Sequence, residues 1–402
     1  SKMGLKQAFF NFVYHNRTKI ADIYFALFFS WLPVKKNKIV FTNYQGSGYG
    51  CNPKYIAEEI IRQNLPLELV WIAKPEFFAD KDFPQQIRVV NYYDQHSCLR
   101  ELATASIWVD NYSKFNFVNA GLRKKKNQLY INTWHGSLGI KRIDENVKSL
   151  KANRAWKPTA VKDYGLIDKM ISNSDFETNV YRDALWFKGE ILKLGHPRND
   201  IFHKDDKELK RLIKERLGIP YDTKIALYAP SFRDNLRIDF FNLDYDELKA
   251  CLESKTSEKW AIVSRFHPKN FLKVQYLSHK ADAQTDASFY PDIQELLYVA
   301  DILISDYSSC MFDFMLTKRP CFIYAEDIEQ YNNERGFYYK LEETPFPIAE
   351  NNIQLMENIN NFDHNKYEKA CSKFLETKGA LEDGKASKRV VDIVRRILKN
   401  EI

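Results

Sequence analysis

His135 stands where an apolar run of the sequence ends, a position from which an imidazole could take part in proton transfer. The run covers residues 128–134 (QLYINTW), and the turn-forming stretch 136–139 (GSLG) follows the histidine. A neutral imidazole can accept a proton from an attacking hydroxyl group. The adjoining glycine allows a substrate to approach the backbone closely. A histidine that only packs at the end of a strand is the alternative, and the glycine-rich turn favours the catalytic role.

Cationic side chains follow another apolar run, residues 260–264 (WAIVS). Arg265 and His267 come directly after it, and Pro268 makes their turn rigid. Guanidinium and imidazole groups can bind phosphate oxygens through charge-assisted hydrogen bonds. Basic turns are common on protein surfaces, so this segment indicates a phosphate site only together with its neighbours.

Further polar side chains in the second half of the chain are expected to reach the same crevice. Ser231 and Arg233 follow the apolar run KIALYA and add a hydroxyl group and a cation. Asp292 and Glu295 lie at the start of an expected helix and are candidates for contacts to a ribose or a base. A solvated helix face would have the same composition, so these two carboxylates are open to either interpretation.

The last candidate segment joins a strand to a helix and covers residues 305–313 (SDYSSCMFD). The hydroxyl groups of Ser308 and Ser309, with the free amide groups of a helix start, can cradle a phosphate. Asp313 lies in the same segment and belongs to the candidate donor site. Asp306 or Ser308 could instead serve only as the cap of the helix.

Composition and missing motifs exclude several classes of protein. The chain of 402 residues is 45% hydrophobic and 28% charged, which excludes a disordered or collagen-like protein. Its net charge of +7 is too small to indicate nucleic-acid binding, but it favours binding of anionic substrates or of an anionic membrane surface. The six cysteines are scattered, and no Walker A, HExxH, GxSxG or CxxC motif occurs. We therefore expect no metal site, no cofactor, no nucleic-acid partner and a reducing compartment.

Short apolar runs alternate with helical patterns after residue 35, which predicts parallel, doubly wound sheets. The expected strands are residues 38–44, 67–73, 87–90, 106–110, 128–134 and 169–174 in a first series, and 224–229, 260–266, 301–305 and 320–324 in a second. We expect two Rossmann-like domains, residues 36–195 and 196–402, that face each other across a cleft. The second domain is expected to end in a closing helix. Ligands of such architectures bind beyond the carboxyl ends of the strands.

Residues 1–35 differ from the rest of the chain. Apolar and aromatic residues recur there at helical spacing and are interrupted by basic ones. This pattern predicts an amphipathic helical arm that either packs on the body or lies on a membrane surface. Its longest apolar run, residues 23–33, has 11 residues, whereas a membrane-spanning helix needs about 20.

An ordered string of motifs gives more specific information than any single one. The motifs are NxxG with CNPKYI in residues 43–56, TWHG in 133–136, LGHPRND in 194–200, YAPSFRD in 228–234, RFHP in 265–268 and DIQELLYVADILISDYSSCMFDF in 292–314. Together they resemble the CDP-glycerol glycerophosphotransferase family, which builds teichoic acids and related capsule polymers. The resemblance extends over about residues 38–345.

The resemblance implies a GT-B-like pair of Rossmann domains that uses a CDP-alcohol donor without a metal ion. His135 corresponds to the catalytic histidine of the family. His267 is expected to stabilise phosphate charge in the same reaction. The donor pyrophosphate and nucleotide are assigned by the resemblance to Arg233, Arg265, His267, Ser308 and Ser309.

The expected reaction transfers glycerol phosphate, or a related polyol phosphate, from CDP-glycerol to a hydroxyl group of a lipid-linked or polysaccharide acceptor and releases CMP. The expected location is the cytoplasmic face of a bacterial membrane. An alternative is a CMP-sugar-dependent glycosyltransferase of capsule synthesis, because sialyl- and Kdo-transferases carry similar HP and SS elements. A second alternative is a nucleotide-binding scaffold without activity.

Overall fold

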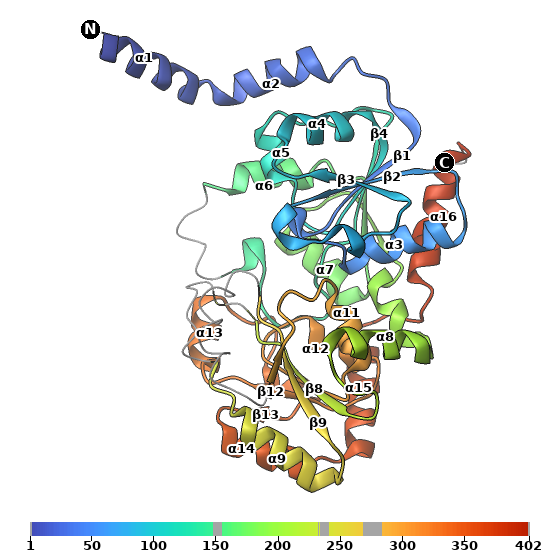
Figure 1. Cartoon of the computed structure of the whole chain (residues 1–402). Coiled ribbons are helices and arrows are strands. Elements are labelled where there is room, and N and C mark those ends of the chain that lie inside the picture. The colour runs from blue at the N-terminus through green and yellow to red at the C-terminus, as the bar shows by residue number, and fades with distance from the viewer. Residues whose placement is uncertain (1, 148–154, 232, 234–240, 268–283, 401–402) are drawn as a thin grey trace.

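The fold of a computed structural model is described for residues 2–147, 155–231, 233, 241–267 and 284–400. Two parallel sheets lie one above the other in Figure 1, and helices cover their faces. This architecture confirms the predicted α/β class with two Rossmann-like units. Pro268 lies outside the described residues, so its predicted contact with the donor stays a prediction.

The first sheet has seven strands in the order β3-β2-β1-β4-β5-β6-β7. Its strands are β1 (Lys35–Thr42), β2 (Glu68–Ala73), β3 (Ile87–Asn91), β4 (Ala105–Asp110), β5 (Leu129–Asn132), β6 (Lys169–Ser172) and β7 (Glu190–Lys193). The last five residues of β1 are all buried, because helices cover both faces of this sheet. A strand segment buried on both faces is apolar rather than alternating, and the central residues 39–41 (IVF) of β1 show this pattern.

The second sheet has six strands in the order β10-β9-β8-β11-β12-β13. Its strands are β8 (Lys224–Tyr228), β9 (Trp260–Ser264), β10 (Gln284–Asp286), β11 (Ile302–Ser305), β12 (Cys321–Tyr324) and β13 (Ile348–Ala349). In both sheets the strand order reverses beside the first strand, β1 or β8. Ligands bind at such a reversal in open α/β sheets.

The helices of the first part of the chain are α1 (Lys2–His15), α2 (Arg17–Phe28), α3 (Cys51–Arg62), α4 (Gln95–Thr104), α5 (Phe115–Asn119), α6 (Lys157–Tyr164) and α7 (Asp175–Ala184). Those of the second part are α8 (Lys207–Leu217), α9 (Tyr245–Thr256), α11 (Ile293–Val299), α12 (Cys310–Met315), α13 (Ile328–Glu334), α14 (Asn352–Asn360), α15 (His364–Thr377) and α16 (Ala386–Leu398). Between the two parts, a 3-10 segment, η6 (Pro197–His203), follows β7.

The last helix returns to the first sheet. Val390, Val391 and Val394 of α16 are buried in one cluster with Ile39 and Ile56 of the first unit. Figure 1 shows α16 beside α3, away from the second sheet. The sequence pattern assigns residues 196–402 to the second domain, whereas the packing of this helix places it on the first.

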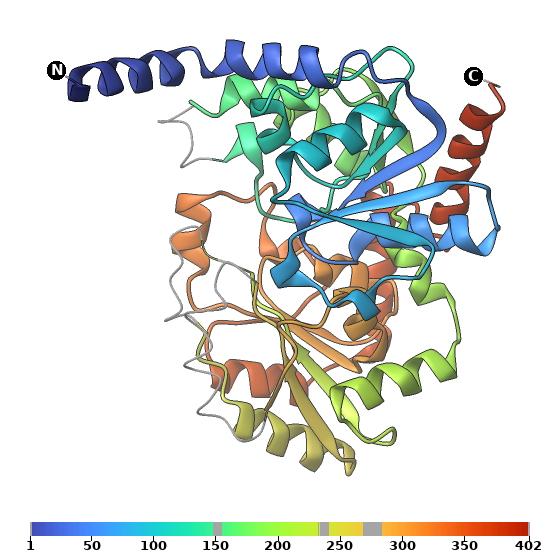
Figure 2. The ribbon, with the colours of Figure 1, turned by 45° about the horizontal axis from the view of Figure 1, so that its top comes forward.

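The helical arm is present, but its amphipathic character is not confirmed. No residue of α1 is buried, and large apolar side chains such as Phe9 and Phe10 are exposed. Lys6 lies three and four residues before these phenylalanines, on the same side of the helix, so charged and apolar side chains are mixed. In Figure 2 the arm extends along the top of the molecule and beyond it. Phe25 and Phe29 are buried against the first unit.

None of the helices described is both long and apolar enough to cross a membrane.

Candidate active site

The two candidate histidines lie close to one tyrosine ring. His135 follows β5, Tyr44 follows β1 of the same sheet, and His267 follows β9 of the other sheet. The ring centroid of Tyr44 is 4.9 Å from that of His135 and 6.1 Å from that of His267. The carboxyl ends of the two sheets therefore meet at this place and bring the predicted base and the predicted phosphate ligand together.

The tautomer of His135 follows from its hydrogen bond to Asn111. The Nδ1 atom lies 2.8 Å from the backbone carbonyl oxygen of Asn111. A carbonyl oxygen can only accept, so Nδ1 carries the proton, and Nε2 of the neutral ring keeps a free lone pair. The Asn111 amide group is itself fixed: its Oδ1 accepts from the Tyr44 amide at 2.7 Å, and its Nδ2 donates to Asn43 Oδ1 at 2.8 Å.

The surroundings of His135 disfavour its charged form. Its ring packs against the rings of Tyr44, Tyr112 and Trp134. Desolvation by these rings lowers the pKa of His135 to about 3, and the hydrogen bond to the Asn111 carbonyl opposes this only in part. Nearby positive charges of Lys141, Arg198 and Arg335 act in the same direction as desolvation. The imidazole is therefore neutral at pH 7, and the cations around it suit a phosphate-bearing substrate.

Arg265 is a cation whose described hydrogen-bond partners are backbone carbonyl oxygens. Its Nη1 donates to the carbonyl of Ala287 at 3.1 Å and to that of Tyr290. Within the described ranges no carboxylate lies within 4 Å of its guanidinium. Burial lowers its pKa to about 10, although the charge of Asp292 favours the cation. A desolvated cation of this kind would gain an ion pair from a bound pyrophosphate.

Arg233, by contrast, is already neutralised. Its Nε donates to Asp327 Oδ2 at 2.7 Å, and its Nη2 donates to Asp306 Oδ2 at 2.9 Å. Burial alone would lower the pKa of Arg233, but these two carboxylates outweigh it and raise the pKa. The side chain is buried, so its guanidinium supports the loop that carries Ser231. The hydroxyl of Ser231 is buried and has no hydrogen-bond partner among the described residues, and its predicted contact with the donor stays a prediction.

Asp292 and Glu295 form an ion-pair cluster between the two units. Lys54 of α3 lies 2.9 Å from Asp292 Oδ2 and 3.3 Å from Glu295 Oε2. The hydroxyl of Tyr55 donates to Asp292 Oδ2 at 2.6 Å, and Asp292 also caps α11. Beside the cluster lies a cavity of about 300 Å³ that Glu58 also lines. These contacts join the units, so a role in holding the ribose or base remains a prediction.

Ser308 and Ser309 directly precede α12 and are half-buried. The hydroxyl of Ser308 accepts from the Cys310 amide at 3.3 Å, as expected for a residue before a helix. A β-carbon at Gly139 would lie 4.0 Å from Ser309 Cβ, so the loop after His135 reaches this helix start. The structure therefore brings both serines to the same junction as His135.

Asp313 lies deeper in α12, and its carboxylate is engaged by other side chains. Arg198 donates to its Oδ2 at 2.8 Å and to its Oδ1 at 3.2 Å. Asn199 donates to Oδ1 at 3.1 Å. The side chain is buried, so these contacts fix the helix, and direct contact between Asp313 and the donor stays a prediction.

The loop that follows His135 is tied to the second unit. Lys141 and Phe337 form an antiparallel bridge. The amide of Arg142 donates to the carbonyl of Gly336 at 2.9 Å, and the amide of Tyr338 donates to that of Ile140 at 2.7 Å. Because of this backbone pairing, Arg335 lies near enough to His135 to disfavour its protonated form.

Sequence reasoning did not single out Tyr44, Asn111 or Arg198 as site residues. Tyr44 lies just before the glycine-rich residues 46–50 (GSGYG), and its backbone has a left-handed φ of 41°. No periodicity signals such a residue. The LGHPRND motif contains Arg198, but its spacing does not reveal what the side chain would contact.

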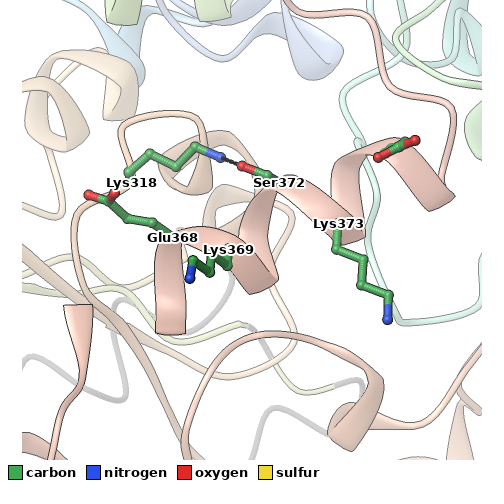
Figure 3. A pocket seen from close by; sticks show the side chains of 6 residues that line it. Lys318, Glu368, Lys369, Ser372 and Lys373 are labelled. Atoms are coloured by element: carbon green, nitrogen blue, oxygen red, sulfur yellow. Dashed lines mark hydrogen bonds between the residues drawn. The ribbon is translucent and has the colours of Figure 1, made fainter. Parts of the chain in front are cut away.

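A surface pocket elsewhere contains none of the predicted residues. It has a volume of about 440 Å³ and is drawn in Figure 3. Side chains of α15 and of Lys318 line it, and Lys318 Nζ donates to Ser372 Oγ at 2.9 Å. Its lining consists of lysines, glutamates and one serine, and it lacks the aromatic rings that surround His135. In the parts of the chain that the structure describes, no group of three metal-binding side chains occurs.

Comparisons with known proteins agree on one family. The family model described as CDP-Glycerol:Poly(glycerophosphate) glycerophosphotransferase matches residues 24–396. The teichoic acid poly(glycerol phosphate) polymerase of Bacillus spizizenii is 32% identical over 398 residues, which cover 94% of this chain and 97% of that protein. The teichoic acid glycerol-phosphate transferase of Staphylococcus aureus is 34% identical over 377 residues, covering 89% of this chain and 93% of that protein.

Solved structures give the same result. The wall teichoic acid polymerase TagF aligns with a TM-score of 0.82 and 28% identity, covering 99% of this chain and 98% of that one. A variant of TagF soaked with CDPG aligns with a TM-score of 0.81. The chain spans about half the length of two further polymerases. All these relatives are teichoic acid enzymes by name, so they give no support to the alternative of a CMP-sugar transferase in capsule synthesis.

Proposed function

We propose, since the chain belongs to the CDP-glycerol:poly(glycerophosphate) glycerophosphotransferase family, that it transfers glycerol phosphate from CDP-glycerol to a hydroxyl group of a teichoic acid chain or its lipid-linked precursor. CMP is the second product. The observation that carries the proposal is the meeting of His135 and His267 around Tyr44 at the junction of the two sheets. The family match gives this arrangement its substrate class.

His135 acts as the general base. Its Nε2 lone pair accepts the proton of the acceptor hydroxyl while the acceptor oxygen attacks the β-phosphorus of CDP-glycerol. The bond between that phosphorus and the bridging oxygen breaks, and CMP leaves with the electron pair. The lowered pKa of His135 keeps the ring unprotonated before the reaction, and the bound donor phosphates raise its basicity once they are in place.

The second unit binds the donor and stabilises the charge that develops on the leaving group. Arg265 supplies a cation, His267 supplies a ring N–H, and the hydroxyl groups of Ser231, Ser308 and Ser309 supply neutral donors. Arg233 acts indirectly, because its charge is balanced by Asp306 and Asp327. Donors that are fixed before the reaction stabilise a transition state more effectively than mobile water does.

The acceptor is membrane-linked in this proposal, and the arm holds the enzyme at the cytoplasmic face. The exposed aromatic and aliphatic side chains of α1 and α2 support this role, because they would be buried among lipid headgroups and acyl chains. Lys35 and Lys36, where the arm meets the first strand, would attract anionic lipids.

The proposal is tested by measuring CMP release with a synthetic lipid-linked acceptor. The full chain is incubated separately with CDP-glycerol, CDP-ribitol and a CMP-sugar, and His135→Gln serves as the inactive control. We expect CMP release and acceptor extension with CDP-glycerol. Preference for CDP-ribitol would show that the donor carries ribitol rather than glycerol. Preference for the CMP-sugar would refute phosphate transfer. No turnover with any donor would favour a binding scaffold without activity.

A further inference from the structure

We infer that Arg198 is a positioning residue that fixes the backbone directly after the His135 side chain relative to the donor helix α12. The inference rests on the proposed role of His135 as the base. It concerns how the base from one unit is held in register with the phosphate-binding elements of the other.

Arg198 connects three segments through one buried guanidinium. Its Nη1 donates to the carbonyl oxygen of His135 at 3.0 Å, and its Nη2 donates to that of Gly136 at 2.7 Å. Its Nε and Nη2 donate to the carboxylate of Asp313 in α12. Its Nη1 also lies 3.4 Å from Cys51 Sγ at the start of α3. The side chain therefore contacts the first unit and the second at the same time.

Asn52 completes the arrangement. Its Oδ1 accepts from the backbone amide of Arg198 at 3.0 Å, and its Nδ2 donates to the carbonyl of Trp134 at 3.2 Å. The carbonyl groups of residues 134, 135 and 136 are thus each held by a side chain of this pair. Asn52 is fully buried, so water does not compete for these bonds.

The backbone here needs such support. Trp134 has a φ of 55°, a left-handed conformation that costs energy for a bulky side chain and persists only where the surroundings enforce it. This turn determines the direction in which the His135 ring leaves the backbone. If the carbonyl groups of His135 and Gly136 lost their donors, the turn would relax and the His135 ring would move from its place beside Tyr44.

Arginine is the residue type that this task requires. Its planar guanidinium offers five donors in a fixed fork, which can serve a carboxylate and two carbonyl groups together. The ammonium group of lysine could keep the charge opposite Asp313, but it could not reach all three acceptors in one plane. Arg198→Lys therefore separates charge balance from positioning.

The test is a double-mutant cycle on the full chain with CDP-glycerol and a lipid-linked acceptor. Arg198→Lys is expected to lower kcat roughly 10- to 100-fold, the range for a misplaced catalytic group, while KM for CDP-glycerol changes less than about threefold. In the His135→Ala background the same substitution should change the residual rate less than about twofold, because there is no ring left to position. Arg88→Lys, at an ion pair with Glu68 and Glu101, is the control and should keep the wild-type kcat.

Two results would overturn the inference. One is a folded Arg198→Lys variant with the wild-type kcat, and the other is an equal loss in both backgrounds, which indicates a general structural role. If Arg198→Lys does not fold, Arg198→Gln combined with Asp313→Asn replaces the charged pair with a neutral one. A kcat equal to that of Asp313→Asn alone would then overturn the inference, and a further loss that depends on His135 would support it.

The failure of this inference can be told apart from the failure of the proposed function. An active His135→Ala variant would refute the base itself, and the positioning role would fall with it. An inactive His135→Ala variant together with a fully active Arg198→Lys variant would refute the positioning role alone.

Discussion

The Nδ1 atom of His135 and the carbonyl oxygen of Asn111 lie 2.8 Å apart, and this one contact determines which ring nitrogen can act as a base. The carbonyl cannot donate, so the contact is lost if Nδ1 gives up its proton. It thereby favours the tautomer with a free Nε2. In effect a backbone carbonyl does here what a carboxylate does in many histidine-dependent sites.

Replacement of His135 tests its role as the base. We expect His135→Gln to lower kcat by roughly 10² to 10⁴, with donor affinity nearly unchanged because the donor contacts come from the second unit. Steady-state kinetics and binding of CDP-glycerol to the variant give the two quantities. Turnover at the wild-type rate would contradict the assignment.

The pH dependence tests the surroundings of the same ring. The active form is the deprotonated one, and the pKa of His135 in the free enzyme is lowered to about 3. The acid limb of the pH profile of kcat/KM reports pKa values of the free enzyme. Its midpoint should therefore lie well below the ordinary imidazole pKa of about 6.5. We expect kcat/KM at pH 5.5 to match that at pH 7, provided circular dichroism shows the chain folded at both. A limb centred near pH 6.5 would contradict this expectation.

The two arginines of the second unit should behave differently. Arg265→Ala should weaken use of CDP-glycerol about tenfold to over a hundredfold, the value of one or two charge-assisted hydrogen bonds, with a small change in melting temperature. Arg233→Ala should destabilise the fold by about 3–5 kcal/mol, because it leaves Asp306 and Asp327 buried without a partner. Denaturant titrations and kinetics on both variants test this contrast. Equal stability of the two variants would contradict the different roles assigned to Arg233 and Arg265.

Truncation of the arm tests membrane attachment without disturbing the core. Removal of residues 1–16 eliminates α1 and keeps Phe25 and Phe29, which are buried against the first unit. We expect the truncated chain to keep its melting temperature and transfer to a soluble acceptor, and to cosediment less with anionic vesicles, because the exposed apolar side chains of α1 are lost. Phe25→Ala is the contrasting variant and should lower stability. Undiminished vesicle binding after truncation would place the anchor elsewhere.

Metal removal tests the charge balance at the donor site. A pyrophosphate can be neutralised by a divalent ion or by protein donors, and Arg265 with His267 and the serines could serve as the latter. We expect activity to persist in excess EDTA. Activity that disappears with EDTA and returns with Mg²⁺ would indicate a metal-dependent reaction and would direct attention to Asp306 and Asp313.

The sequence revealed the parts of this fold whose residues are apolar for local reasons. Strands such as β1 and β5 lie inside covered sheets, so each contains a short apolar run, residues 39–41 (IVF) and 129–131 (LYI), and His135 could be placed just after the second. The strands β10 and β13 have three and two residues, too few to form a pattern. An amphipathic helix such as α16 shows that it has a buried face, but not which sheet covers it.

Long-range pairing explains what the sequence could not reveal about the site. Arg233 and Arg265 look alike in the sequence, yet Arg233 is neutralised by carboxylates 73 and 94 positions further along the chain. The contacts of Arg198 with residues 135 and 136 span 63 and 62 positions. Spacing rules describe neighbours within one element, so they cannot detect a balance of charge that forms only when separate elements meet.

The return of α16 to the first sheet has a consequence for how the protein is made. Val390, Val391 and Val394 complete the core around Ile39 and Ile56, so segments that lie far apart in the sequence must pack together. During synthesis, the core of the first unit is incomplete until α16 has left the ribosome, and the second unit can complete its own core earlier. The unit translated first is therefore expected to be the last to reach its final stability.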